Sequence, residues 1–315
     1  MVRRIATSLV IAVVLALVVG GSAADAGSGR LLIRAKMAAA LAPLPGGGLV
    51  YGELASGRIW RLSADGRRSR RPVAQVSAST NGLRGLLGLA VDSRGRVFAD
   101  WTGKDHLIHV AQVAPGRKRA IWSPGADADE ANGGRLALGV DGRLIVTVGD
   151  RDQSVQPNPV GGAPLAPAFP GFSGGIFSVD PDGSPAQTPQ LLAPGYFNPF
   201  GLAVTPSGQV WTTDNAVTPT GDLIARVHDG TAEPFAYMAH TAPSGLAAID
   251  DTTLAVCGFV SRRLDRFVVG PDGTAHASGP PIARGCTIGV IRLANGRLAY
   301  ANARAIYVVA AAGGR

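Results

Sequence analysis

The stretch Leu86–Phe98 reads LLGLAVDSRGRVF, an apolar run, a short turn centred on Gly95, and a second apolar run. Two such runs separated by a turn rich in Gly and Asp predict adjacent antiparallel β-strands. Gly suits this turn because tight hairpin turns need a residue that tolerates positive φ. The stretch therefore predicts one β-hairpin, and the rest of the chain repeats it.

The hairpin pattern occurs in six copies along the chain. The other five copies are Ala40–Tyr51, Arg135–Val146, Phe200–Trp211, Ser244–Val256 and Ile288–Tyr300. Successive turns are about 45 residues apart, which is the length of one four-stranded propeller blade. One step is longer by roughly 20 residues, and this step contains a Gly/Pro-rich insertion at Gln153–Phe172.

One copy of the repeat cannot bury its own apolar faces, whereas six copies stacked around an axis can. We therefore expect an all-β, six-bladed β-propeller that forms a single domain over residues 27–315. A strand near Leu31–Ala35 is expected to pair with the C-terminal strand Ala305–Val309 and close the ring. A β-sandwich is the competing architecture, but it does not predict a period of about 45 residues.

Composition agrees with this architecture and restricts the partners. The chain has 43 Gly, 22 Pro and 46% hydrophobic residues, which is typical of a globular protein with many tight turns. Its net charge is +8, and the densest basic run is Arg67–Arg71. That run lies in an expected loop with no aromatic residue inside it, so nucleic acid is not an expected partner. Attraction to acidic polymers of the cell envelope needs only diffuse charge.

Residues 1–26 predict a secretory signal peptide. Arg3 and Arg4 give a positive start, Leu9–Val19 is continuously apolar, and Ala24-Asp25-Ala26 offers small residues for cleavage. The apolar run is short for a membrane span, which needs about 20 residues, so we expect no span in the mature chain. A retained N-terminal anchor is the alternative. In both cases the bulk of the chain is expected outside the cytoplasm, either secreted or in the periplasm or cell envelope.

The two cysteines, Cys257 and Cys286, fit that location. Both fall in predicted strands of the last two repeats, so they could lie in neighbouring blades, and an even pair in an oxidising compartment often forms a disulfide. Two buried thiols are the alternative. A zinc site is not expected, because neither cysteine has a CxxC partner or a nearby pair of histidines.

Several motifs, in order, resemble a known family. They are Gly85–Ala90 (GLLGLA), Asn132–Leu136 (NGGRL), Gly139–Gly142, Val148–Asp150, Ser173–Ser184 (SGGIFSVDPDGS), Asn198–Leu202 and Ala242–Leu246 (APSGL). Together the motifs are similar to those of the glucose/sorbosone dehydrogenases, six-bladed propellers that oxidise sugars with the quinone cofactor PQQ and calcium. The resemblance implies a sugar-like ligand at one end of the propeller.

The residues that carry the family's chemistry differ in this chain. The position of the general-base His is Ala131, and the position of an Arg that stabilises charge on the quinone is Phe197. The stretch that matches the family's two cofactor-clamping arginines is Cys286–Gly289, which contains no arginine. The family also has a pair of neighbouring acidic residues, of which only Asp222 is present in this chain. Loss of a general base alone lowers a rate by about 10²–10⁴. We therefore expect PQQ-dependent oxidation to be impaired or lost.

The candidate site residues are polar residues expected at the mouth of the propeller. They are Asn132, Arg135, Asp150, Asn198, Asp214 and Asp222, with Asp214 and Asp222 as candidate metal ligands.

Three alternatives stay open from the sequence. His106 or His109 could replace the missing base. The chain could be a non-catalytic binding propeller outside the cytoplasm. It could also be a calcium-dependent, lactonase-like hydrolase, in which Glu53, Asp150, Asn198 and Asp214 would hold the metal and the metal would activate water.

Overall fold

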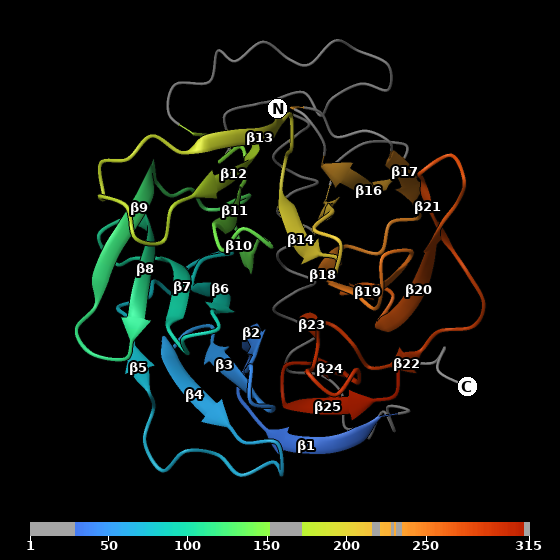
Figure 1. The fold of residues 1–315 in the computed structure, drawn as a ribbon, viewed down its shortest axis with the longest axis horizontal. Coiled ribbons are helices and arrows are strands. Elements are labelled where there is room, and N and C mark those ends of the chain that lie inside the picture. The colour runs from blue at the N-terminus through green and yellow to red at the C-terminus, as the bar shows by residue number, and fades with distance from the viewer. Residues whose placement is uncertain (1–28, 152–171, 216–220, 228–229, 231–234, 312–315) are drawn as a thin grey trace.

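The computed structural model describes residues 29–151, 172–215, 221–227, 230 and 235–311, and the account below concerns these residues. The expected signal peptide, residues 1–26, and nearly all of the Gln153–Phe172 insertion lie outside them. Within the described part of the chain, six β-sheets are arranged around a central axis (Figure 1). The expectation of an all-β, six-bladed propeller is confirmed.

The first three blades follow one another from the N-terminal side, and each runs from an inner strand outward. Blade 1 contains β2 (Ala38–Pro43), β3 (Leu49–Glu53), β4 (Arg58–Leu62) and β5 (Ala74–Gln75). Blade 2 contains β6 (Leu86–Val91), β7 (Val97–Thr102), β8 (Leu107–Ala114) and β9 (Arg119–Ala126). Blade 3 contains β10 (Gly133–Leu138), β11 (Leu144–Val148), β12 (Gly175–Val179) and β13 (Gln190–Pro194).

The last three blades continue the ring. Blade 4 contains β14 (Pro199–Val204), β15 (Val210–Asp214), β16 (Asp222–Val227) and β17 (Phe235–Met238). Blade 5 contains β18 (Pro243–Ala248), β19 (Thr253–Gly258), β20 (Arg263–Val269) and β21 (Ala275–Ala277), with β22 (Ala283–Arg284) paired to β20. Blade 6 contains β23 (Gly289–Arg292), β24 (Leu298–Ala301), β25 (Ala305–Val309) and β1 (Arg30–Arg34).

The ring is closed by the pairing of its two terminal strands. β1 is antiparallel to β25, with Arg30 opposite Val308 and Arg34 opposite Ala305. The first described strand thus supplies the outermost strand of the last blade, as the sequence predicted. This pairing leaves no open junction between the ends of the ring.

The hydrophobic core consists of the layers between neighbouring blades. Successive side chains of a strand point to opposite faces of its sheet, so each apolar strand contributes to two layers. In β7, for example, Ala99 packs toward blade 1 while Phe98 packs toward blade 3. The same arrangement produces a buried cluster at each of the six blade junctions of the described chain.

A disulfide joins blade 5 to the segment that enters blade 6. Cys257 lies on β19 and Cys286 lies three residues before β23, and their sulfur atoms are bonded. Both residues are fully buried. The predicted pairing is confirmed. No helix in the described ranges is both long and apolar enough to span a membrane.

We use the term mouth for the end of the propeller at which the inner strands begin. The inner strands β2, β6, β10, β14, β18 and β23 start there, and the second strand of each blade ends there. The candidate residues that lie within two residues of a strand end at this level are Asn132, Asp150, Asn198, Asp214 and Asp222.

Candidate functional site

Arg135 lies on the propeller axis and links all six blades. Its side chain extends from β10, and its five N–H groups donate to backbone carbonyls of the other five blades. The pairs are Nε to Phe200 (3.1 Å), Nη1 to Ala39 (2.6 Å) and Leu87 (2.9 Å), and Nη2 to Ser244 (2.5 Å) and Ile288 (3.0 Å). A guanidinium has five N–H donors, so none remains for a ligand.

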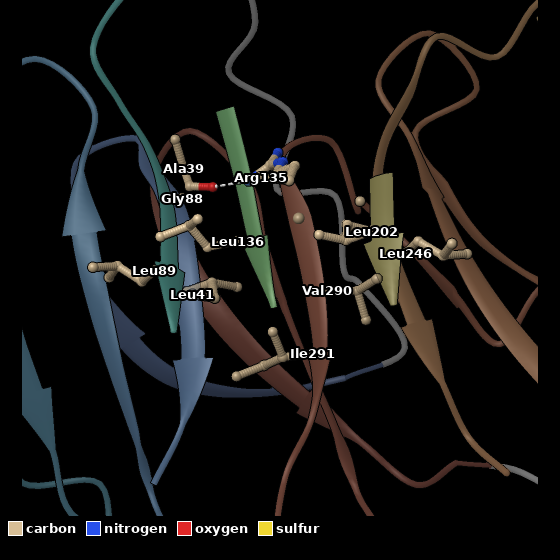
Figure 2. Close-up of a pocket in the computed structure, with 12 residues that line it drawn as sticks. Ala39, Leu41, Gly88, Leu89, Arg135, Leu136, Leu202, Leu246, Val290 and Ile291 are labelled. Atoms are coloured by element: carbon tan, nitrogen blue, oxygen red, sulfur yellow. Dashed lines mark hydrogen bonds between the residues drawn. The ribbon is translucent and has the colours of Figure 1, made fainter. Parts of the chain in front are cut away.

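A cavity of about 60 Å³ lies along the axis beside Arg135. Figure 2 shows the guanidinium near one end and leucine side chains from several blades along the wall. The wall includes Leu41, Leu89, Leu136, Leu202, Leu246 and Ile291. Small-molecule sites usually measure about 300–1,000 Å³, so this cavity is too small for a sugar. The channel beside Arg135 therefore does not hold a sugar-sized ligand.

Asp100 is a buried carboxyl that the sequence analysis did not single out. It lies on β7 between apolar residues and is fully buried. Neither carboxyl oxygen has a hydrogen-bond partner in the described part of the molecule. Burial raises the pKa of Asp100 well above its usual range, and the positive charge of Arg135 opposes that rise. An Asp in the middle of an otherwise apolar strand was the signal that could have identified it.

Asp214 holds the loop that enters β14 through hydrogen bonds to its backbone. It is buried at the end of β15, where Oδ2 accepts the N–H of Phe197 (2.9 Å) and Oδ1 accepts the N–H of Asn198 (2.6 Å). Burial raises the pKa of Asp214 to about 7; the two N–H groups oppose this rise, and the carboxyls of Asp150 and Asp222 add to it. The structure therefore brings three of the candidate carboxyls into one electrostatic cluster.

Asp222 has the same role one blade further on. Its Oδ2 accepts the N–H groups of Thr241 (2.8 Å) and Ala242 (2.9 Å), which lead into β18. Burial raises the pKa of Asp222, and those two N–H groups oppose the rise. Each of these carboxylates fixes the backbone at the start of an inner strand.

Asp150 and Asn198 complete the polar group between blades 3 and 4. Asp150 is fully buried, and its backbone N–H donates to the carbonyl of Phe197 (2.8 Å). The side-chain oxygen of Asn198 accepts the N–H of Gly133 (3.2 Å), and its carbonyl accepts the N–H of Asn215 (3.1 Å). Asp150, Asn198 and Asp214 therefore lie around one loop.

Asn132 is buried and satisfied within its own loop. Its side-chain amide exchanges two hydrogen bonds with the backbone of Ala128, at 2.9 Å and 2.8 Å. Asn132 and Arg135 thus fix the backbone on either side of the β10 start, and neither joins the carboxyl cluster through a hydrogen bond.

Ala131 and Phe197, which the resemblance places at the family's base and arginine positions, lie beside that cluster. Ala131 is 1% exposed and has positive φ (52°), and a Cβ placed on Gly149 would lie 1.9 Å from its carbonyl oxygen. Phe197 is partly exposed, and its backbone is held between Asp150 and Asp214. In blade 6 the matching stretch contributes the disulfide of Cys286 and the axial carbonyl of Ile288.

His106 belongs to a second polar cluster at the mouth of blade 2. Its Nδ1 lies 3.4 Å from Oδ1 of Asp127, whose buried carboxylate is bonded to Arg84 through Nε (2.5 Å) and Nη2 (3.2 Å). The imidazole is 68% exposed. His109 instead pairs with Asp105 (3.0 Å) and stacks on Trp101, within blade 2.

A search of the described ranges finds no group of three or more His, Cys, Asp or Glu side chains arranged to hold a metal ion. Glu53 lies at the end of β3 in blade 1, where it accepts the hydroxyl of Ser56 (2.6 Å). Both carboxylate oxygens of Asp214 and Oδ2 of Asp222 accept backbone N–H groups. These carboxyls therefore act on loop structure in the conformation observed.

Comparison with known proteins assigns the fold to a family. The family model for Glucose / Sorbosone dehydrogenase matches residues 35–232. The chain belongs to this family. No curated protein matches it.

Solved structures of sugar dehydrogenases share the architecture. The PQQ-bound aldose sugar dehydrogenase from Streptomyces coelicolor is 20% identical, with a TM-score of 0.69, and the match covers 90% of this chain and 98% of that one. The soluble aldose sugar dehydrogenase from Escherichia coli, in the apo form, is 18% identical, with a TM-score of 0.71, and the match covers 90% and 99%. At these identities the likeness is one of fold.

Proposed function

We propose that this glucose/sorbosone dehydrogenase family member is an exported propeller that binds a sugar-like ligand at its mouth without oxidising it through a quinone. The observation that carries the proposal is the methyl group of Ala131 at the position of the family's base. Alanine accepts no proton, so the hydroxyl of a bound sugar would keep its proton there. Removal of a general base alone costs about 10²–10⁴ in rate.

The cofactor that the family implies does not fit the charges of this mouth. PQQ carries three carboxylates, and the family holds it with arginines. Here Phe197 replaces one arginine, and Cys286–Gly289 replaces the stretch with the other two. Two of the mouth carboxyl residues contact the Phe197 backbone, Asp214 through Oδ2 and Asp150 through its backbone N–H. A trianion placed there would lack the three arginine partners that the family uses to hold it.

The carboxyl residues at the mouth do not fit a calcium site either. Calcium takes six to eight oxygen ligands, often from several carboxylates. Asp214 and Asp222 already accept backbone N–H groups, and the described residues contain no three-carboxylate group arranged for a metal. The calcium-dependent, lactonase-like alternative is therefore not favoured, because Asp214, one of its four expected ligands, already accepts two backbone N–H groups.

The groups that remain accessible at the mouth suit a neutral polyol. Phe197, Asn198 and Asn215 are each partly exposed, and the Nδ2 group of Asn215 donates to the carbonyl of Pro243 (3.1 Å). A partly exposed aromatic ring beside amides can stack on the apolar face of a sugar while the amides bond its hydroxyls. Export is proposed from residues 1–26 and is supported by the buried disulfide, since disulfides persist in oxidising compartments.

Isothermal titration calorimetry with D-glucose and with PQQ plus calcium tests the binding proposal. We expect a titratable sugar signal and no PQQ signal. Phe197→Ala should weaken sugar binding by about 5- to 10-fold, the value of one aromatic contact. Leu191→Ala, which removes an exposed apolar side chain on β13 away from the mouth, is the matched control. Undetectable binding of D-glucose and related aldoses, or an unchanged affinity in Phe197→Ala, would overturn the sugar site.

Export is tested separately. Mass spectrometry of protein recovered outside the cytoplasm should show an N-terminus at residue 27. A chain that retains Met1 and stays in the cytoplasm would contradict export without affecting the sugar proposal.

A further inference from the structure

The positive charge of this protein is concentrated in one part of the propeller. Residues 30–75 carry nine Lys or Arg and two Asp or Glu, a net charge of +7. Residues 76–315 carry nineteen of each and are neutral overall. Residues 30–75 form β1 and blade 1. The described residues after 75 carry 18 Lys or Arg and 16 Asp or Glu, so seven of the nine net positive charges of the described chain lie on these two adjacent blades.

All nine basic side chains in this region are exposed. They are Arg30, Arg34, Lys36, Arg58, Arg61, Arg67, Arg68, Arg70 and Arg71. We call this set the basic edge. The two acids in the same range do not neutralise it: Asp65 pairs with Arg67 alone, and Glu53 accepts the hydroxyl of Ser56.

The arginine-rich segment of the basic edge has a fixed backbone. The N–H of Ser69 donates to the carbonyl of Arg61 (2.8 Å), and Leu62 and Arg68 form an antiparallel bridge. Residues 67–71 therefore run back along β4 as an extra edge segment rather than as a free loop. A Cβ on Gly66 would lie 3.4 Å from Leu32 of β1, so the turn that precedes the segment touches blade 6. The cations of β1 and of the segment thus belong to one continuous surface.

The aromatic ring in this surface is already covered. The guanidinium of Arg68 lies 4.4 Å from the ring centroid of Trp60, and its Nη1 lies 3.5 Å from the hydroxyl of Tyr51. Binding of single-stranded nucleic acid relies on aromatic rings that are open for base stacking. The basic edge offers repeated cations without such a ring, which favours a polymer that carries charge but no bases.

Eight of the nine cations of the basic edge are arginines, whose planar guanidinium pairs bidentately with phosphate oxygens. We propose that the basic edge is a docking surface for a linear, phosphate-bearing polyanion without bases. This proposal is independent of the sugar site at the mouth, because it uses different residues on the outer strands of blades 6 and 1. Affinity of this kind arises mainly from release of counterions, so it falls steeply as salt is added.

Fluorescence anisotropy of the full chain with labelled long-chain polyphosphate, measured over a range of salt concentrations, tests the proposal. The test variant is Arg67→Ala/Arg70→Ala/Arg71→Ala, which spares the packed Arg68. The control is Arg94→Ala/Arg117→Ala/Arg292→Ala, which removes the same charge from exposed positions on blades 2 and 6. Thermal unfolding should show that both variants fold like the parent.

We expect the parent chain to bind polyphosphate with a negative dependence of log K on log salt. Each lost contact should lower the slope by about 0.7, so the test variant should lose about 2 from the slope and about 100-fold in affinity at 0.1 M salt. The control should keep most of its affinity. No binding of polyphosphate, or equal losses in the two variants, would overturn the proposal. Tighter binding of single-stranded DNA with the same number of charges would overturn it in favour of nucleic acid.

Discussion

Nη1 of Arg135 lies 2.6 Å from the carbonyl oxygen of Ala39, a residue 96 positions earlier in the chain and two blades away around the ring. The same guanidinium reaches the inner strands of four further blades. Burial lowers the pKa of Arg135 to about 10, so the group stays charged at neutral pH. One side chain thus satisfies five carbonyls that would otherwise point into the channel.

Replacement of Arg135 should destabilise the whole propeller. Arg135→Ala leaves five buried carbonyls and Asp100 without their cation, and removal of one partner of a buried charge network costs about 3–5 kcal/mol. Arg135→Lys keeps the charge but has three donors, so its loss should be smaller. Urea unfolding measures both changes. A free energy of unfolding within about 1 kcal/mol of the parent for Arg135→Ala would contradict the axial role.

Asp214 should make stability depend on pH. Its pKa is about 7 in the folded chain and about 3.9 in an unfolded one, so the folded state holds the proton more tightly. Its stabilising contribution is complete below pH of about 4 and is lost as pH rises through about 7. The Asn side chain of Asp214→Asn does not titrate. Its NH2 group would take the place of one carboxyl oxygen and would therefore face a backbone N–H donor.

The Asp214→Asn variant should therefore be less stable than the parent at pH 4.5, and the gap should narrow by pH 8. Asp100 and Asp222 also have raised pKa values and remain in both proteins, so the difference between parent and variant isolates Asp214. Urea unfolding across this pH range measures the gap. A gap that stays constant would show that Asp214 does not titrate in this window.

The Cys257–Cys286 disulfide should contribute to stability by restricting the unfolded chain. The two cysteines are 29 residues apart, and closure of a loop of that size is worth about 3–4 kcal/mol in the chain-entropy model. Cys257→Ala/Cys286→Ala should lose about that amount in urea unfolding. The parent measured under strong reductant is the comparison. A loss below about 1 kcal/mol in both would refute the predicted contribution.

Gly149 should be required for the backbone beneath the mouth. A Cβ at this position would lie 1.9 Å from the carbonyl oxygen of Ala131, so Gly149→Ala must displace the segment that enters β10. We expect a loss of about 2–4 kcal/mol by thermal or urea unfolding. Gly46→Ala is the control, because a Cβ there meets no atom within 4 Å. Equal stability of the two variants would show that the mouth accommodates a side chain at Gly149.

The sequence was sufficient to predict the propeller, its closure and the disulfide. The six hairpins repeat with a regular period, and pairing of β1 with β25 follows from the need to cover the last open edge. Apolar residues within each hairpin indicate the buried strands directly, so the burial of residues such as Phe98 could be predicted from the sequence around them.

The roles of the polar residues could not be predicted in the same way. Arg135 and Arg143 both lie in the third repeat, and only the assembled ring shows that Arg135 points along the axis. Asp214 binds N–H groups 16 and 17 residues earlier, across a hairpin whose register the motif does not specify. The charge of the basic edge could have been found by counting along the sequence, but its continuity depends on blade 6 lying beside blade 1.

The account depends most on the proposal that quinone-dependent oxidation is lost because Ala131 and Phe197 replace the family's base and arginine. The direct measurement is dye reduction by the purified chain, preincubated with PQQ and calcium, with a panel of aldoses and with the cofactor omitted as the control. We predict that the rate with PQQ will equal the rate without it. Turnover that requires PQQ and saturates with one of the sugars would contradict the account and would identify the chain as an active dehydrogenase.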